Sequence, residues 1–154
     1  DGHGRALTAQ LVQREDVLGL ALLRLDAPPT DAPRLIWAAR DAFPGSPAHV
    51  VAAMAGEPAW PRLRSGFVST RTLGVDLGSA ARGGAVFDIA GRVIGVSLAG
   101  DDGADRLITV SALRRWLGEK LGEDRAETAS PPMPLDAIYE NALRATVLLR
   151  ASPS

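Results

Sequence analysis

The sequence predicts an all-β fold that is closed by a C-terminal helix. A turn rich in small residues at 78–84 leads into a short apolar segment, and a second turn at 88–91 reverses the chain into an apolar strand at 93–99. This is the pattern of a tight antiparallel hairpin. Elsewhere, short strand-like segments alternate with Gly and Pro turns at the spacing of a sandwich or barrel. The closing helix is predicted from Ser111 onward.

Size and composition allow one domain and disfavour several functional classes. The chain has 154 residues, of which 46% are hydrophobic, enough for one real core. Its formal net charge is -1, so no global field attracts nucleic acid or anionic lipid. The absence of cysteine excludes a disulfide framework, a thiolate zinc site and a cysteine nucleophile. No apolar run reaches the length of a membrane span. We therefore expect no nucleic-acid partner and no membrane span.

The N-terminal part of the chain is predicted to form a hairpin. Residues 1–4 are a turn signal, and residues 6–14 alternate small or apolar with polar side chains, as a half-buried strand does. Residues 17–25 are almost wholly apolar, which is typical of a strand covered on both faces. The proline-rich residues 27–33 then form a stiff connector.

The remaining elements are also short. Strands are expected at residues 34–39, 48–55, 63–70, 73–77 and 106–110. The closing helix would be capped by the Ser111 hydroxyl and would place four apolar side chains on one face: Leu113, Trp116, Leu117 and Leu121.

The last part of the chain has its own pattern. Residues 122–134 show no periodicity and are predicted to be a flexible linker. Asp136 then caps a second short helix, and residues 145–150 are expected to form a strand.

Three motifs resemble trypsin-like serine proteases, especially the HtrA branch. Residues 78–88 and the returning strand resemble the pattern Gly-Asn-Ser-Gly-Gly-Pro-Leu-Phe-Asp followed by Gly-x-Val-Ile-Gly-Val. Asp16 and residues 20–24 resemble Asp-x-x-x-Asp-Leu-Ala-Leu-Leu-Lys, and residues 65–69 resemble Thr-x-Gly-Ile-Val-Ser. The resemblance covers about residues 6–118. It implies antiparallel β-barrels, with a complete C-terminal barrel and a partial N-terminal one.

The resemblance also divides the chain. Residues 1–121 would be the trypsin-like domain, with 1–28 the remnant of the N-terminal barrel and 34–121 the C-terminal barrel and its helix. Residues 135–154 resemble the very start of such a domain, displaced to its end. Either this segment folds back to supply the first strand in a permuted order, or it belongs to a neighbouring domain. We favour folding back, because an unpaired apolar strand promotes aggregation. Since the sequence starts at Asp1 rather than Met, we take it as a processed form or a part of a longer chain.

The resemblance implies that the catalytic triad is missing. Acyl transfer in this family needs a hydroxyl nucleophile, an imidazole base, a carboxylate and backbone donors for the oxyanion. In this register the serine position is Arg82, the acid position is Gly19, and the histidine would lie upstream of the residues present. One oxyanion glycine is replaced by Ala80, whereas Gly83 and Gly84 match the family's pattern. We therefore expect a catalytically inactive pseudo-protease.

A binding role follows from the same loop. The Arg82 guanidinium would enter the vacated cleft and bind a carboxylate of a peptide or protein partner; the competing interpretation is a solvated arginine paired with Asp76 or Asp88. The expected peptide-binding residues come from the loop and the strand that follows it: Ala80, Arg82, Gly83, Ser97 and Leu98. An extended peptide would add to the strand edge. The resemblance implies a periplasmic or otherwise extracytoplasmic location, and oligomer formation stays open.

Two alternative functions remain. A serine hydrolase could be completed by residues of another chain or by another hydroxyl such as Ser79, which is more simply explained as a turn residue. A metal-binding module could use His3, because Asp-Gly-His with a free amine offers a square-planar Cu(II) or Ni(II) site, or His49, which is more simply a packed histidine. No other cofactor is expected.

Two further features are assigned to structure rather than function. Of the three tryptophans, Trp60 is the best candidate for an exposed anchor, although packing is the default for all of them. The acidic loop containing Asp101, Asp102 and Asp105 lacks the spacing of an EF-hand and is predicted to be a solvated turn.

Overall fold

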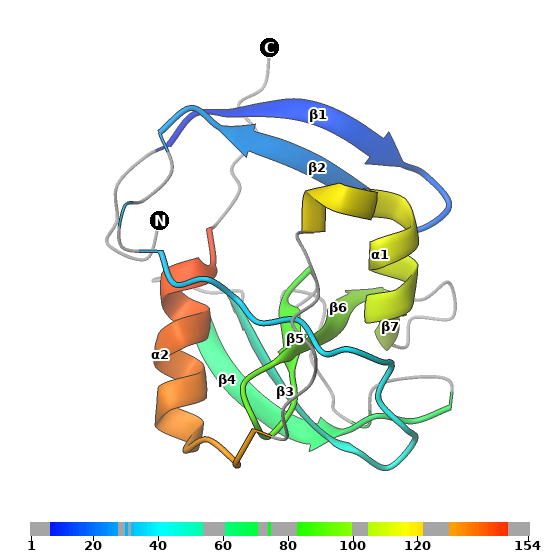
Figure 1. Cartoon of the computed structure of the whole chain (residues 1–154), viewed down its shortest axis with the longest axis vertical. Coiled ribbons are helices and arrows are strands. Elements are labelled where there is room, and N and C mark those ends of the chain that lie inside the picture. The colour runs from blue at the N-terminus through cyan, green and yellow to red at the C-terminus, as the bar shows by residue number, and fades with distance from the viewer. Residues whose placement is uncertain are drawn as a thin grey trace.

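A computed structural model of the chain describes residues 7–27, 30, 32–53, 61–70, 74, 83–99, 105–121 and 130–147. Two antiparallel sheets and two short α-helices make up its regular structure (Figure 1). The fold is therefore mostly β, as the sequence predicts. No helix within these ranges is long and apolar enough to span a bilayer.

The smaller sheet is the predicted N-terminal hairpin. Its strands are β1 (Ala9–Glu15) and β2 (Leu20–Leu25), which pair antiparallel with Leu11 opposite Leu23 and an irregularity between Leu11 and Gln13. Figure 1 shows this hairpin at one end of the molecule, on the far side of helix α1 from most of the larger sheet. Both strands begin about three residues later than the sequence pattern indicates.

The larger sheet has five strands in the order β4-β3-β5-β6-β7. Every neighbouring pair is antiparallel. The bounds are β3 (Pro47–Ala53), β4 (Pro61–Phe67), β5 (Ala85–Phe87), β6 (Val93–Ala99) and β7 (Asp105–Thr109). Within the described residues β4 and β7 form the two outer edges and do not pair with each other. The expected complete C-terminal barrel is thus not closed in this part of the chain.

The predicted strand at 34–39 does not form, and the segment keeps only a bridge to β6. Trp37 makes a single isolated bridge with Val93. The carbonyl oxygens of Ala38 and Ala39 instead accept hydrogen bonds from Arg114, each at 2.7 Å. The segment's backbone bonds to the sheet are those with Val93, which donates to the Ile36 carbonyl at 2.8 Å and accepts from the Ala38 N–H at 2.9 Å.

The central hairpin that the sequence predicts is present and is closed by Asp88. The Asp88 N–H donates to the Arg92 carbonyl at 2.9 Å, and its Oδ1 accepts from the N–H groups of Ala90 and Arg92, both at 2.9 Å. The side chain therefore satisfies the turn's own backbone donors, which is why an aspartate suits this position.

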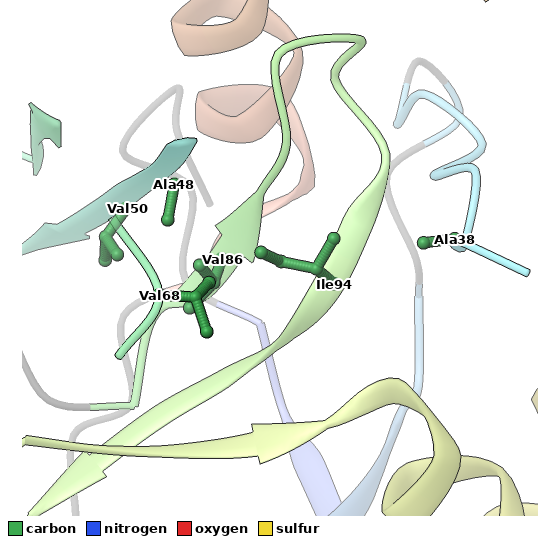
Figure 2. Packing of buried hydrophobic residues seen from close by; sticks show 6 residues of the cluster. All are labelled: Ala38, Ala48, Val50, Val68, Val86 and Ile94. Atoms are coloured by element: carbon green, nitrogen blue, oxygen red, sulfur yellow. The ribbon is translucent and has the colours of Figure 1, made fainter. Parts of the chain in front are cut away.

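The central strands of the larger sheet, β3, β5 and β6, are buried on both faces. One face carries the apolar cluster shown in Figure 2, which consists of Ala38, Ala48, Val50, Val68, Val86 and Ile94. The other face carries a second cluster of Val51, Phe87, Val93, Ile138 and Ala142. Since neighbouring residues such as Val50 and Val51 enter opposite clusters, the central strands β3, β5 and β6 are almost continuously apolar.

Helix α2 (Leu135–Ala145) covers the second face. Its Ile138 and Ala142 are almost inaccessible, with 1% and 0% of their surfaces exposed. The Tyr139 hydroxyl donates to the Pro61 carbonyl at 2.8 Å and ties the helix to the start of β4. The helix is thus part of the core of this sheet, although it lies far along the chain from β3 and β5.

Strands β6 and β7 approach each other very closely. A Cβ at Gly95 would lie 2.2 Å from the Ile108 carbonyl oxygen, much closer than real contacts allow. Glycine is therefore required here by the close approach of two backbones.

The helix caps differ from the sequence-based expectation. Helix α1 (Val110–Leu117) is capped by Thr109, whose Oγ1 accepts from Ala112 N–H at 3.5 Å, and it is followed by a 3₁₀ turn, η2 (Gly118–Leu121). The prediction that Ser111 caps this helix is wrong, because that side chain bonds Asp41 instead.

The second helix also starts without the predicted cap. Pro134 precedes it with no side-chain cap hydrogen bond, and Asp136 accepts from Ala137 N–H inside the first turn. The predicted strand at 145–150 is not seen where the chain is described: Ala145 ends the helix, residues 146 and 147 are not in a strand, and residues 148–150 lie outside the described residues.

Candidate functional site

The N-terminal hairpin meets the larger sheet at the β1–β2 turn, and this junction is the candidate site. The Leu18 carbonyl accepts a hydrogen bond from Arg106 Nη2 at 3.0 Å. A Cβ placed on Gly19 would be 3.8 Å from Leu98 Cδ1, which is ordinary van der Waals contact. Leu98 and Arg106 are paired neighbours on β6 and β7. The turn therefore lies against the outer part of these two strands.

The loop that precedes β5 is joined to β6 by two backbone hydrogen bonds. The Gly83 N–H donates to the Ser97 carbonyl at 2.7 Å, and the Ser97 N–H donates to the Gly84 carbonyl at 2.9 Å. These bonds continue the β5–β6 ladder by one step toward the loop. The loop's end is thus fixed beside the same strand that the β1–β2 turn approaches.

Ser97 itself is completely buried, with 0% of its surface exposed. Its Oγ has no hydrogen-bond partner among the described residues. On β6 its neighbour along the chain, Leu98, points to the opposite face, toward Gly19. Ser97 therefore holds the loop through its backbone, whereas its hydroxyl is enclosed.

The structure brings four of the predicted site residues into one neighbourhood: Gly19, Gly83, Ser97 and Leu98. The other predicted members of this site, Ala80 and Arg82, lie outside the described residues, as do Ser79 and Asp76. Asp88, one of the two carboxylates considered for Arg82, makes an ion pair with Arg92 at 2.7 Å. Its carboxylate is therefore already engaged in closing the central hairpin.

The backbone at Gly19 has a left-handed conformation, with φ of 72°. A residue with a side chain adopts this conformation at a cost of about 1–2 kcal/mol. The conformation of the turn thus favours glycine at this position. Glycine has no carboxylate. An aspartate introduced here would have to strain the turn or change its shape.

His49 lies on β3, which is separated from β6 by β5. It is 7% exposed, and its Nδ1 is 2.8 Å from Ser65 Oγ on β4. Burial lowers the pKa of His49 below its usual 6.5, and the negative charge of Asp88 opposes that shift. The imidazole is therefore neutral at physiological pH and is held by a cross-strand hydrogen bond.

The metal-binding hypothesis gains no support from this arrangement. The described residues contain no group of three or more His, Asp or Glu side chains that could hold a metal ion. His3 lies outside the described residues. A role for either histidine in metal binding stays a prediction.

The tryptophans and the acidic loop singled out in the sequence are described only in part. Trp37 is packed against the second apolar cluster, and Trp116 is half-buried in α1, whereas Trp60 is outside the described residues. Asp105 is the first residue of β7 and is 9% exposed, so it is not part of a solvated turn; Asp101 and Asp102 are not described.

Sequence reasoning missed a polar cluster around Asp41. Ser111 donates to this carboxylate through its N–H at 2.9 Å and its hydroxyl at 2.6 Å. Burial alone would raise the pKa of Asp41, but the hydrogen bonds of Ser111 and Thr109 and the charge of Arg114 outweigh it and lower the pKa. The two hydroxyls at the helix start were a visible signal, whereas nothing in the sequence indicates Asp41 as their partner.

An open pocket of about 310 Å³ lies close to this cluster. Its lining comes from three segments: Ala42, Pro44, Val68, Ser69, Thr70, Leu107 and Thr109. It does not include any of the predicted site residues. The junction and the pocket are therefore separate features of the molecule.

Comparison with known proteins identifies the fold. No protein-family model matches the chain, and no curated protein matches it either. Among solved structures, the MamO protease domain from Magnetospirillum magneticum in its apo form is similar, with a TM-score of 0.57 and 17% identity over 73% of this chain and 69% of that one. The serine endoprotease from Yersinia pestis has a TM-score of 0.61 and 22% identity over 77% of this chain.

The chain spans only 46% of the Yersinia protein. Both neighbours are proteases, so the predicted likeness to trypsin-like serine proteases is confirmed at the level of the fold. Identities this low carry no conclusion about activity.

Proposed function

We propose that this chain is a catalytically inactive trypsin-like domain that binds a protein or peptide at the junction of the β1–β2 turn with β6. The observation that supports this most directly is the packing of Gly19 against Leu98. In the register of the resemblance, Gly19 occupies the position of the catalytic acid. A residue without a side chain can neither orient nor stabilise an imidazolium.

The loop before β5 supports the same proposal. Its sequence register places Arg82 at the nucleophile position, directly before Gly83, and a guanidinium stays protonated and is not a nucleophile. Gly83 is bonded to the Ser97 carbonyl, so the chain leaves this loop beside β6. A charged donor here suits the carboxylate of a bound peptide.

Strand β6 offers a backbone edge for that peptide. Along this strand β5 pairs only as far as Val96, and the two loop glycines bond Ser97. Among the described residues, Leu98 and Ala99 pair with β7 alone. An extended peptide could therefore add its backbone beyond Ser97, with the Leu98 side chain as an apolar contact.

Two measurements test the proposal. The chain should neither cleave casein nor be labelled by a fluorophosphonate, because the positions of nucleophile and acid lack the required groups. It should bind members of a library of fluorescent peptides with free C-termini, measured by anisotropy. Binding should weaken at least about tenfold in Leu98→Asp and Arg82→Ala, whereas Arg115→Ala on the exposed side of α1 should bind as the parent chain does.

Stoichiometric labelling of Ser79 or another serine would overturn inactivity and favour the hydrolase alternative. Equal binding by the parent chain and the Leu98 and Arg82 variants would place the peptide elsewhere. By its fold likeness we also propose an extracytoplasmic location, which fractionation of the producing cells would test.

A further inference from the structure

The open pocket near the start of helix α1 combines an apolar surface with hydroxyl groups. Its apolar lining includes three residues that belong to the first apolar cluster or pack against it: Ala42, Val68 and Leu107. Its hydroxyl-bearing lining residues come from two separate segments: Ser69, Thr70 and Thr109. The volume of about 310 Å³ is close to the lower limit for small-molecule sites. We call this feature the hydroxyl pocket.

The lining of the hydroxyl pocket, which lies entirely within the described residues, contains no charged side chain. A charged group that leaves water needs an opposite charge or several hydrogen bonds to compensate for its lost hydration. An aliphatic group instead gains free energy when it leaves water for a contact with the apolar cluster, whose Val68 is 6% exposed. The pocket therefore suits a ligand with an apolar body and an uncharged polar head.

The direction of the hydrogen bonds at the start of α1 decides which polar head fits. The Ser111 hydroxyl has a single proton, and it donates this proton to the Asp41 carboxylate at 2.6 Å. The contact of 3.1 Å between the Thr109 and Ser111 hydroxyls must therefore use the Thr109 proton. Thr109 is thus a donor toward the Asp41–Ser111 pair and has no proton left for a ligand.

Thr109 can still accept a hydrogen bond. Its oxygen has two lone pairs, and one of them faces the Ala112 N–H at the long distance of 3.5 Å. Thr109 lies on the same face of β7 as Leu107, and both residues line the pocket. The hydroxyl pocket thus contains an acceptor that is polarised by the nearby Asp41 carboxylate. Such a group favours a donor on the ligand and disfavours an anion.

We propose that the hydroxyl pocket binds a small uncharged ligand that has an aliphatic body and a hydrogen-bond donor head, such as a primary amide or an alcohol. The aliphatic body packs on Val68 and Leu107, and an N–H or O–H of the head donates to Thr109 Oγ1. This site is separate from the proposed peptide site and does not depend on it.

Three ligands with one aliphatic body and different heads test the proposal: isovaleramide, isovalerate and isoamylamine. Each is titrated into the full chain at neutral pH and followed by amide NMR shifts. Isovaleramide should bind with the millimolar affinity expected for so small a ligand, and the shifts should centre on Val68, Leu107 and Thr109. Isovalerate should bind at least about tenfold more weakly, because its carboxylate and Thr109 are both acceptors. Isoamylamine should also bind more weakly, because the lining offers its charge no partner.

Two pairs of variants locate the ligand. Ala42→Leu fills the pocket and should abolish the binding of isovaleramide, whereas Ala39→Leu, at an exposed alanine, should leave it unchanged. Thr109→Val removes the acceptor and should weaken binding roughly 3- to 10-fold. Thr109→Ser keeps the hydroxyl and the helix cap and should bind as the parent chain does. The dispersion of the amide spectrum reports whether each variant is folded.

Asp41→Asn tests the direction of the hydrogen bonds. Its side-chain amide can donate to Ser111, which leaves the Thr109 proton available to a ligand, so the preference for isovaleramide over isovalerate should shrink. An unchanged preference in this variant would overturn the proposal. The same conclusion would follow if isovaleramide did not bind, if it bound equally to Ala42→Leu and Ala39→Leu, or if isovalerate or isoamylamine bound as tightly.

Discussion

Ser111 donates both its backbone N–H and its hydroxyl to the carboxylate of Asp41, and this pair joins the start of helix α1 to the segment that precedes β3. The same segment is bonded to the helix through Arg114 and the carbonyls of Ala38 and Ala39. Helix α1 is thus attached to the sheet by polar contacts as well as by its buried Leu113.

Removal of this contact should destabilise the chain in a pH-dependent way. We expect Ser111→Ala to lower the free energy of unfolding by about 1 kcal/mol in urea titrations at neutral pH, because the site is partly solvated. The pKa of Asp41 is lower in the folded chain than its usual 3.8, so its contribution is present above that pH and is lost as the pH falls through the folded value.

Asp41→Asn should therefore reduce stability at neutral pH and flatten the decline of stability below about pH 4. Asp136→Asn, at an exposed carboxylate in the first turn of α2, is the matched control. An unchanged acid limb in Asp41→Asn would show that other carboxylates carry the pH dependence.

His49 should make the fold sensitive to mild acid. Burial lowers the pKa of His49 below 6.5, so the unfolded chain takes up its proton at a higher pH than the folded chain does. Stability should then fall as the pH drops below about 6.5 toward the folded value. Urea unfolding between about pH 7.5 and 5 measures this slope.

His49→Gln keeps a polar contact for Ser65 but cannot be protonated, and should flatten that slope. The control is His3→Gln, which removes the chain's only other histidine. A slope that disappears in His3→Gln and persists in His49→Gln would refute the assignment.

The docking of α2 should contribute strongly to stability. Ile138 is 1% exposed between the helix and the second apolar cluster, so we expect Ile138→Ala to cost about 2–5 kcal/mol. Leu135→Ala, at a residue of the same helix that is 48% exposed, should cost less than about 1 kcal/mol. Chemical denaturation compares the two, and similar values would mean that the helix is not docked in solution.

Arg106 should hold the hairpin to the sheet. Arg106→Met keeps most of the apolar stem but removes the donor to the Leu18 carbonyl. We expect amide exchange in β1 and β2 to accelerate by roughly 5- to 30-fold, equivalent to about 1–2 kcal/mol, with little change in β3 and β5. Arg115→Met, on the exposed side of α1, is the control. Uniform acceleration throughout the chain would instead indicate a global loss of stability.

The sequence alone determined the local elements. Alternation at residues 6–14 and the apolar run at 17–25 located the hairpin of β1 and β2, and Asp88 followed by Gly91 located the turn between β5 and β6. These structures depend on residues close together in the chain. The motif spacing also indicated the trypsin-like fold, which the comparisons confirm at low identity.

Only the tertiary structure decided how these elements meet. Thr109 and Ser111 are equally good caps in sequence, and the distant Asp41 engages Ser111 and leaves Thr109 as the cap. Likewise the carbonyls of Ala38 and Ala39 are bonded by the distant Arg114, which no local pattern around residues 34–39 indicates. No local sequence pattern predicts the packing of Gly19 on Leu98 either. Such contacts join residues far apart in the chain, so the energy that selects them does not appear in either segment alone.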